Sequence, residues 1–164
     1  MKPEELEDNG PKLEAGEIEA FEKEIGFTLP ADYRDFLWRT NGGVLGEDNG
    51  YFYIENADWW NQLHVFDGLR RPDCETITLR SVLRGFNESY PEIFGPSMGR
   101  LPIASDHCGN QVYLLLDGPQ RGSVYFWMHD ADCPSDRLSS SFAEFFELLR
   151  ERPPKWERPD LYAD

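Results

Sequence analysis

The chain is poor in basic residues. Its 164 residues include 16 lysines and arginines against 31 aspartates and glutamates, which gives a formal net charge of −15. A nucleic-acid-binding protein needs a basic stripe to neutralise phosphates, and this sequence contains none. We therefore expect no direct nucleic-acid partner. An acidic surface attracts basic proteins, although on charge alone solubility is the simpler interpretation.

Long apolar segments and a disulfide framework are also lacking. No stretch approaches the ~20 apolar residues of a membrane helix, and residues 1–5 do not combine a basic start with an apolar run. The three cysteines are irregularly spaced, which indicates free thiols in a reducing compartment. These absences predict a soluble cytoplasmic protein that does not bind a membrane.

What is present suits one domain. The chain is 40% hydrophobic and 14% aromatic, enough for a substantial core. Residues 1–16 form an acidic lead-in without apolar periodicity, and residues 151–164 form a proline-containing tail. The domain is expected between them, at residues 17–150.

The first expected helix spans residues 17–26. Ile18, Phe21 and Ile25 recur at the three-and-four spacing of a one-sided helix, and Gly26 supplies a left-handed C-terminal residue.

The second expected helix begins at Pro30, whose ring presets the helical φ angle. Tyr33, Phe36 and Leu37 form its apolar stripe, and Asn41 followed by two glycines ends it. Phe36 and Leu37 are predicted core residues.

Two short strands are expected next, at residues 51–54 and 63–66, because both segments are aromatic and β-branched. They are predicted to pair, with Trp59 and Trp60 on the connection between them.

The middle of the chain predicts one more helix and a hairpin. Residues 77–86 have helical apolar spacing, whereas residues 87–98, with two prolines, are expected to form a loop. Residues 111–116 and 123–128 predict an antiparallel hairpin, and residues 101–104 are expected to join the same sheet.

The last helix is predicted by a capping box, in which Ser141 precedes Glu144 by three residues. Phe142, Phe145 and Phe146 form its buried stripe. This element order predicts a single α+β domain, with N-terminal helices and a C-terminal helix packed on a mostly antiparallel or mixed sheet.

As an ordered set, these segments resemble the SUKH superfamily, which includes the yeast Smi/Knr cell-wall regulator and many bacterial toxin-immunity proteins. The resemblance runs from about residue 17 to residue 149. The residues that carry it are Ile25-Gly26, Leu29-Pro30, Asp32-Tyr33, Phe36-Leu37 and Asn41-Gly42-Gly43, followed by residues 101–106, 109–114, 122–130 and 141–146.

The resemblance implies a non-catalytic immunity protein that binds and neutralises a cognate polymorphic toxin, often a nuclease, in the cytoplasm. It also permits a regulatory scaffold or adaptor that inhibits no enzyme. It implies no cofactor. A monomer is the simplest expectation.

Histidines and cysteines raise the alternative of a zinc site. His107, Cys108, His129 and Cys133 are the candidate ligands, but structural zinc sites bring ligands in pairs two to four residues apart on a tight turn. Adjacent His107 and Cys108 do not fit that pattern. We therefore expect no metal.

Cysteine catalysis is the other chemical alternative. Cys108 or Cys133 would need activation by a histidine, with His64 as the third candidate base. Neither cysteine follows a strand-to-helix elbow or begins a clear helix, so the sequence does not predict an enzyme.

The distribution of charge suggests a protein-binding surface. Residues 40–67 contain no lysine or arginine, and neither do residues 122–135. Acidic rims around exposed aromatic residues combine burial with electrostatic steering of a basic partner. The predicted partner-binding residues are Glu47, Asp48, Glu55, Asp58, Trp59, Trp60, Asp130 and Asp132.

The competing interpretation is that the aromatic residues of this stretch belong to the core. Strand alternation places either Phe52 and Ile54 or their neighbours inside. Trp59 and Trp60 cannot both enter one core easily, so one of them is expected at the surface.

Overall fold

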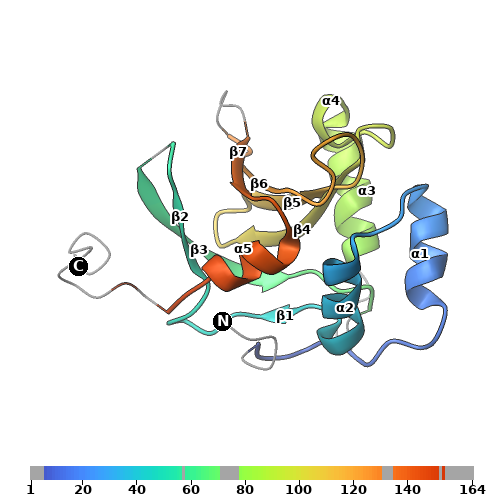
Figure 1. Ribbon diagram of the computed structural model, residues 1–164, viewed down its shortest axis with the longest axis horizontal. Helices are drawn as coiled ribbons and strands as arrows, with labels where there is room; N and C mark the ends of the chain where they lie inside the picture. Colours follow the sequence, from blue (N-terminus) through green and yellow to red (C-terminus); the bar gives the residue numbers. More distant parts are fainter. Residues whose placement is uncertain (1–5, 57, 71–77, 131–134, 152, 154–164) are drawn as a thin grey trace.

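The computed structural model describes residues 6–56, 58–70, 78–130, 135–151 and 153 (Figure 1). Within these ranges the chain forms an α+β domain, as predicted. Its elements are α1 (Glu17–Ile25), α2 (Ala31–Thr40), β1 (Gly43–Val44), β2 (Tyr51–Ile54), β3 (Trp59–Phe66), α3 (Leu79–Ser89), α4 (Pro91–Phe94), β4 (Arg100–Asp106), β5 (Gln111–Leu115), β6 (Val124–Trp127), β7 (Asp136–Ser139) and α5 (Phe142–Leu148).

The strands form one antiparallel sheet in the order β1-β3-β4-β5-β6-β7. The strand β3 is long enough for two sets of partners. Its second half pairs with β1 and β4, and its first half pairs with β2, with Tyr51 opposite Gln62. The β2–β3 hairpin therefore extends beyond the rest of the sheet (Figure 1).

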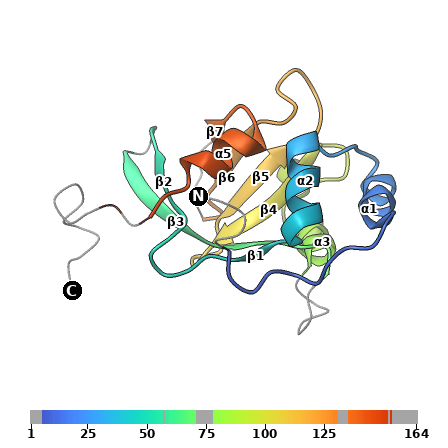
Figure 2. The same cartoon turned by 60° about the horizontal axis from the view of Figure 1, so that its bottom comes forward.

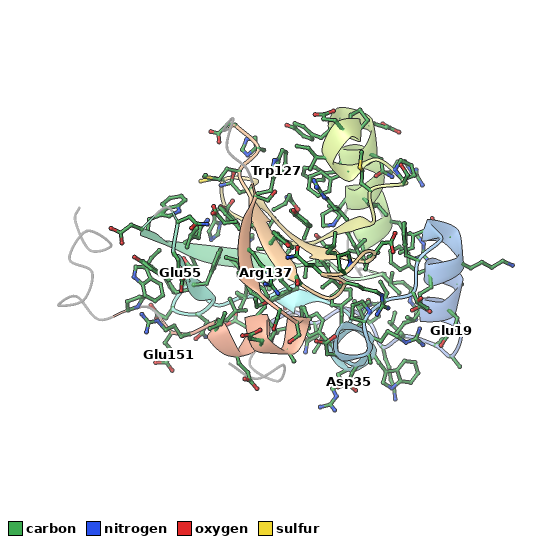
Figure 3. The ribbon with its side chains drawn as sticks, turned by 45° about the horizontal axis from the view of Figure 1, so that its top comes forward. Glu19, Asp35, Glu55, Trp127, Arg137 and Glu151 are labelled. Atoms are coloured by element: carbon green, nitrogen blue, oxygen red, sulfur yellow. The ribbon has the colours of Figure 1, made fainter. Side chains whose placement is uncertain are left out.

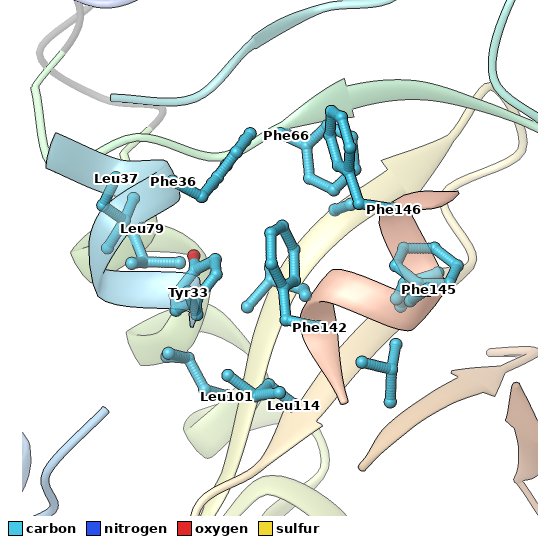
Figure 4. Close-up of a cluster of buried hydrophobic side chains, with 14 of the residues drawn as sticks. Tyr33, Phe36, Leu37, Phe66, Leu79, Leu101, Leu114, Phe142, Phe145 and Phe146 are labelled. Atoms are coloured by element: carbon cyan, nitrogen blue, oxygen red, sulfur yellow. The ribbon is translucent and has the colours of Figure 1, made fainter. Parts of the chain in front are cut away.

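One face of the sheet carries the main core beneath α2 and α5 (Figure 4). Phe36 of α2 is central to it, with ring centroids 5.2 Å from Phe66 and 4.9 Å from Phe142. The structure confirms the five core residues expected from the helix stripes. These buried residues are Phe36, Leu37, Phe142, Phe145 and Phe146.

The opposite face is covered by α3, which Figure 2 shows on the other side of the sheet from α5, and by α4, which packs against α3. Phe94, Tyr113 and Trp127 form a second buried cluster there, with Phe86 and Tyr90 against it. Val112 and Leu114 point to the main core, whereas Tyr113 between them points to the second cluster. A strand covered on both faces is apolar throughout, which explains the continuous apolar run of β5.

The prediction of a loop over residues 87–98 was wrong in its first half. Helix α3 continues to Ser89, and Pro91 begins α4 at a position where its missing N–H has no helical partner. The helix continues because Phe86 and Tyr90 both pack on the ring of Trp127 of β6.

The strands also differ in extent from the sequence prediction. Trp59 and Trp60 begin β3 and do not lie on a connection, because they pair with Ile54 and Tyr53. Strand β4 is central in the sheet and longer than expected. Strands β1 and β7, which were not predicted, are short edge strands with too few apolar residues to show a period.

The described part of the lead-in packs on the domain. Leu6 and Leu13 are buried, and Glu7 exchanges two backbone hydrogen bonds of 2.8 Å with Val44. Within the described ranges, no helix has the length and apolar character needed to span a membrane.

Candidate partner-binding surface

The β2–β3 hairpin positions an aromatic and acidic cluster at one end of the molecule. We call Tyr53, Glu55, Asp58, Trp59 and Trp60 the hairpin tip. Alternation along β2 determines which ring is exposed, because Phe52 and Ile54 point into the core and Tyr53 points outward. Tyr53 is 40% exposed, so of the two alternatives left open by strand alternation the structure selects Phe52 and Ile54 as core residues, and Tyr51 is buried as well.

The two tryptophans point to opposite sides of the hairpin, since they are consecutive in a strand. Trp59 is 37% exposed, which confirms that one of the pair lies at the surface. Trp60 is half-buried and pairs with Tyr53, with ring centroids 5.4 Å apart. The hairpin tip therefore presents an aromatic ring on each of its two sides.

The turn between the strands carries exposed carboxylates. Glu55 and Asp58 are both exposed, and Asp58 accepts a hydrogen bond from the Tyr53 hydroxyl. Asp58 has φ 53°, a left-handed conformation that aspartate and asparagine tolerate better than other side chains. The turn between β2 and β3 thus holds the Asp58 carboxylate close to the rings of Tyr53 and Trp59.

Glu47 and Asp48 lie in the loop before β2, and both are exposed. The side-chain amide of Gln62 donates to the carbonyl oxygens of Glu47, at 2.8 Å, and of Asn49, at 3.0 Å. Gln62 lies two residues from Trp60 on the same side of β3. These hydrogen bonds hold both acidic residues beside the base of the hairpin.

A chain of side-chain hydrogen bonds leads from β3 to His129, the residue before Asp130. Asp106 Oδ2 accepts from Asn61 of β3 at 2.9 Å and from Asn110 at 2.8 Å. Asn110 Oδ1 lies 3.0 Å from His129 Nδ1, and exposed Asp130 follows His129. Asp132 lies outside the described residues.

A basic side chain that local sequence did not indicate also reaches the hairpin. The guanidinium carbon of Arg150 lies 3.9 Å from the ring centroid of Trp60. Arg150 follows α5 and exchanges two backbone hydrogen bonds of 3.0 Å with Tyr51. Residues 40–67 themselves contain no lysine or arginine. In the folded protein, however, the positive charge of Arg150 lies beside this acidic segment.

A cleft of about 320 Å³ separates the hairpin from α5 and β7. Asn56 donates a 2.6 Å hydrogen bond to Asp136 across it. Arg137 and Leu148 also line this cleft, and Leu148 is 50% exposed. Tyr53 was identifiable from strand alternation, but Arg137, Leu148 and Arg150 carried no signal, because tertiary packing alone brings them to the hairpin.

Acidity alone does not locate a binding site. Glu55 and Glu151 lie at the hairpin end of the molecule, whereas Glu19 and Asp35 lie at the other end (Figure 3). Exposed apolar side chains distinguish the two ends of the molecule better than acidic residues do. Tyr53, Trp59 and Leu148 are three of the five large hydrophobic residues that are exposed in the described ranges. Their gathering at the hairpin tip and its cleft favours this end.

The sequence offers His64, His107 and Cys108 as candidates for metal binding or catalysis. The rings of His64 and His107 are 4.2 Å apart, while His107 and Cys108 are exposed in the turn after β4. The Cys108 thiol has no hydrogen-bond partner among the described residues, and these residues contain no group of three or more potential metal ligands. Cys133 lies outside the described residues.

Comparison with known proteins agrees with the fold and the residue pattern. The model of the SMI1 / KNR4 family (SUKH-1) matches residues 12–148. A relative from Bacillus subtilis (strain 168), named SPbeta prophage-derived uncharacterized protein YokK, is 25% identical over 166 residues, which cover 92% of this chain and 82% of that protein. No solved structure matches. Because the family model matches most of its length, the chain belongs to the SMI1 / KNR4 family (SUKH-1).

Proposed function

We propose that this protein is an immunity protein, which binds a cognate toxin and neutralises it without catalysis. Membership of a family that includes toxin-immunity proteins supports this class of function. The observation that carries the proposal is the hairpin tip, where partly exposed Tyr53 and Trp59 lie beside the carboxylates of Glu55 and Asp58. The protein would act in the cytoplasm as a monomer, without a cofactor.

The hairpin tip has the two properties that tight protein binding requires. Large aromatic side chains supply buried area at few positions and dominate binding free energy. Carboxylates around them raise the association rate with a basic partner. A nuclease toxin is basic where it holds phosphate, so an acidic tip could occupy that groove in place of nucleic acid.

A second candidate is a regulatory adaptor that binds several proteins and inhibits none. The mixed charge of the hairpin cleft favours it, because Arg137 and Arg150 lie there beside Glu55 and Asp136. Such a surface suits partners that are not uniformly basic.

Co-purification from the native cells, followed by mass identification of the bound chain, separates the two candidates. Recovery of a toxin whose activity this protein abolishes supports immunity. Recovery of several chains without inhibited activity supports the adaptor.

Two variants, each lacking one exposed tryptophan, test whether the hairpin tip is the binding surface. Trp59→Ala should accelerate dissociation of the captured partner, because an anchoring ring is lost. Trp38 on α2 is 45% exposed and distant from the hairpin, so Trp38→Ala is the matched control. Equal dissociation rates for both variants would place the binding surface elsewhere.

The carboxylates are tested separately from the rings. Changing four of them to amides should slow association and weaken its salt dependence, with little change in dissociation. Asparagine tolerates the left-handed backbone at position 58, so the turn is preserved. The four positions are Glu47, Asp48, Glu55 and Asp58.

A control set carries four exposed carboxylates from other surfaces. It removes the same total charge, so any remaining difference reports position. If both sets slow association equally, net charge alone steers the partner and the hairpin acids have no special role. The control positions are Asp35, Glu88, Glu92 and Asp117.

A further inference from the structure

A second cleft, of about 240 Å³, opens between α1, α3 and the start of β4. The helices α1 and α3 that line it lie at the end of the molecule opposite the β2–β3 hairpin (Figure 1). Buried Phe21, Leu101 and Leu116, with partly buried Leu83, form its apolar floor. We call it the arginine cleft, because three arginines line it.

The arginines concentrate positive charge in an acidic protein. Arg80 and Arg84 lie one turn apart on α3, and Arg100 begins β4. Arg80 is paired with Glu24, with a nitrogen-to-oxygen distance of 2.8 Å. Arg84 and Arg100 have no carboxylate partner among the described residues, although Arg100 lies 5.5 Å from the ring centroid of Tyr113. Two of the three positive charges are therefore available to an anion.

The wall of the arginine cleft also holds an unsatisfied acceptor. The side-chain oxygen of Asn87 is buried and has no hydrogen-bond partner in the described part of the chain. Asn87 lies three residues after Arg84, so both side chains lie on the same side of α3. Buried acceptors are normally paired, and this oxygen would be paired by a ligand with an N–H or O–H donor beside its anionic group once the Asn87 side chain turns into the cleft.

We propose that the arginine cleft binds the C-terminal residue of a partner polypeptide. Its carboxylate would pair with Arg84 and Arg100, its apolar side chain would cover Leu83 and Leu101, and its backbone N–H would donate to Asn87. Capture of a chain end by its carboxylate is an established mode of peptide recognition. This site is separate from the hairpin tip and does not depend on it.

The size and the polar groups of the cleft favour a chain end over other anions. Its volume lies below the ~300–1,000 Å³ of most ligand pockets, which suits one residue better than a nucleotide. A fatty acid has no donor beside its carboxylate for Asn87. Glu24 also lines the cleft, but its charge is opposed by Arg80, so Arg84 and Arg100 leave the site positive.

The test is a titration of the isotope-labelled full chain with acetyl-Ser-Gly-Leu, followed by amide chemical shifts. The peptide with a free carboxylate should give saturable shifts at residues of the arginine cleft. Its C-terminal amide should bind about tenfold more weakly, because charge-assisted hydrogen bonds to two arginines are lost. Equal binding of acid and amide, or no shifts in the cleft at millimolar peptide, would overturn the proposal.

Variants assign the contacts. Arg84→Gln and Arg100→Gln should each weaken the free acid about fivefold or more and leave the amide unchanged. Arg121→Gln is the matched control, since Arg121 donates to the Thr28 carbonyl outside the cleft and its loss should not matter. Thermal unfolding of each variant confirms that it is folded. Acid binding unchanged in both cleft variants would contradict the assignment.

A final titration tests whether the cleft recognises the C-terminus of a polypeptide or only a small molecule with the same chemical groups. N-acetyl-leucine carries the same carboxylate, donor and side chain but no preceding residues. If it binds as tightly as the tripeptide, the arginine cleft recognises a free acylated amino acid and the chain-end proposal fails. Weaker binding of N-acetyl-leucine supports a polypeptide partner.

Discussion

The guanidinium of Arg150 stacks on the ring of Trp60, with 3.9 Å between its central carbon and the ring centroid. The contact fastens the segment that follows α5 to the hairpin. It also places a positive charge beside an otherwise acidic tip. The local sequence around Trp60 predicts neither effect, because Arg150 reaches the hairpin only through the backbone bridge to Tyr51.

Arg150→Gln should destabilise the protein by about 0.5–1 kcal/mol, the usual free energy of an exposed cation–π contact. Arg150→Lys keeps a positive charge at this position and should lower the free energy of unfolding by less. Urea unfolding of both variants measures the difference. Arg84→Gln serves as the control, because it removes an exposed arginine that has no ion pair or hydrogen bond among the described residues. An unfolding midpoint for Arg150→Gln equal to that of the parent would show that the stacked geometry contributes nothing to stability.

Asn41 has a larger structural role than ending α2. It is 1% exposed, and its amide donates to the carbonyls of Pro11, at 2.8 Å, and Arg70, at 3.0 Å. Its side-chain oxygen accepts from the Leu69 backbone at 2.7 Å. The backbone of Asn41 is left-handed, with φ 50°. Asn41 therefore joins three segments that are distant in sequence.

Asn41→Ala should destabilise the protein by about 3–5 kcal/mol, because it loses three hydrogen bonds and keeps a left-handed backbone. Asn41→Gly loses the same hydrogen bonds but accepts the backbone, so it should be about 1–2 kcal/mol less destabilising than Asn41→Ala. Denaturant unfolding gives both values. If glycine restored full stability, the side-chain hydrogen bonds would be irrelevant.

Helix α5 offers an internally matched test of the core. Phe145 is fully buried, whereas Leu148 on the same helix is 50% exposed. Phe145→Ala should lower the free energy of unfolding by about 3–5 kcal/mol, since it removes a buried ring and leaves a cavity. Leu148→Ala should change it by less than about 0.5 kcal/mol, as is usual for a surface position. Similar losses for both variants would refute the assigned helix face.

Tyr33 is buried, and its hydroxyl has no hydrogen-bond partner among the described residues. Replacing an unsatisfied buried hydroxyl by hydrogen removes a desolvation penalty. Tyr33→Phe should therefore leave stability at pH 7 unchanged, or raise it by up to about 1 kcal/mol. Thermal or urea unfolding at pH 7 measures this. A loss of more than about 1 kcal/mol would reveal a hydrogen bond of that hydroxyl.

The same residue predicts a loss of stability at alkaline pH. Burial raises the pKa of Tyr33 well above its ordinary value of 10.0, and the charge of Asp67 adds to this. Above pH 10 the unfolded chain releases this proton while the folded protein retains it, so the unfolded state gains stability as pH rises. The parent should lose up to about 1.4 kcal/mol more per pH unit than Tyr33→Phe between the two pKa values. Parallel pH dependences above pH 10 would contradict this.

The sequence by itself determined the elements whose pattern is local. Ile18 and Phe21 in α1, Phe36 and Leu37 in α2, and the phenylalanines of α5 repeat at helical spacing, and a stop residue or cap lies beside each stripe. The β5–β6 hairpin and its apolar alternation are equally local. These patterns, in their order, were sufficient to identify the family and the α+β class.

Only the tertiary structure decided what depends on contacts between distant segments. Helix α3 continues to Ser89 because Phe86 and Tyr90 pack on Trp127, which is distant in the sequence but lies on the same face of the sheet. Arg150 reaches Trp60, and Arg84 and Arg100 line one cleft, because separate elements pack together. Side-chain periodicity reports one buried face of one element. It carries no information on which distant side chain covers that face. The hairpin tip is local in sequence, but Arg150 beside it and the meeting of Arg84 with Arg100 in the arginine cleft depend on such distant contacts.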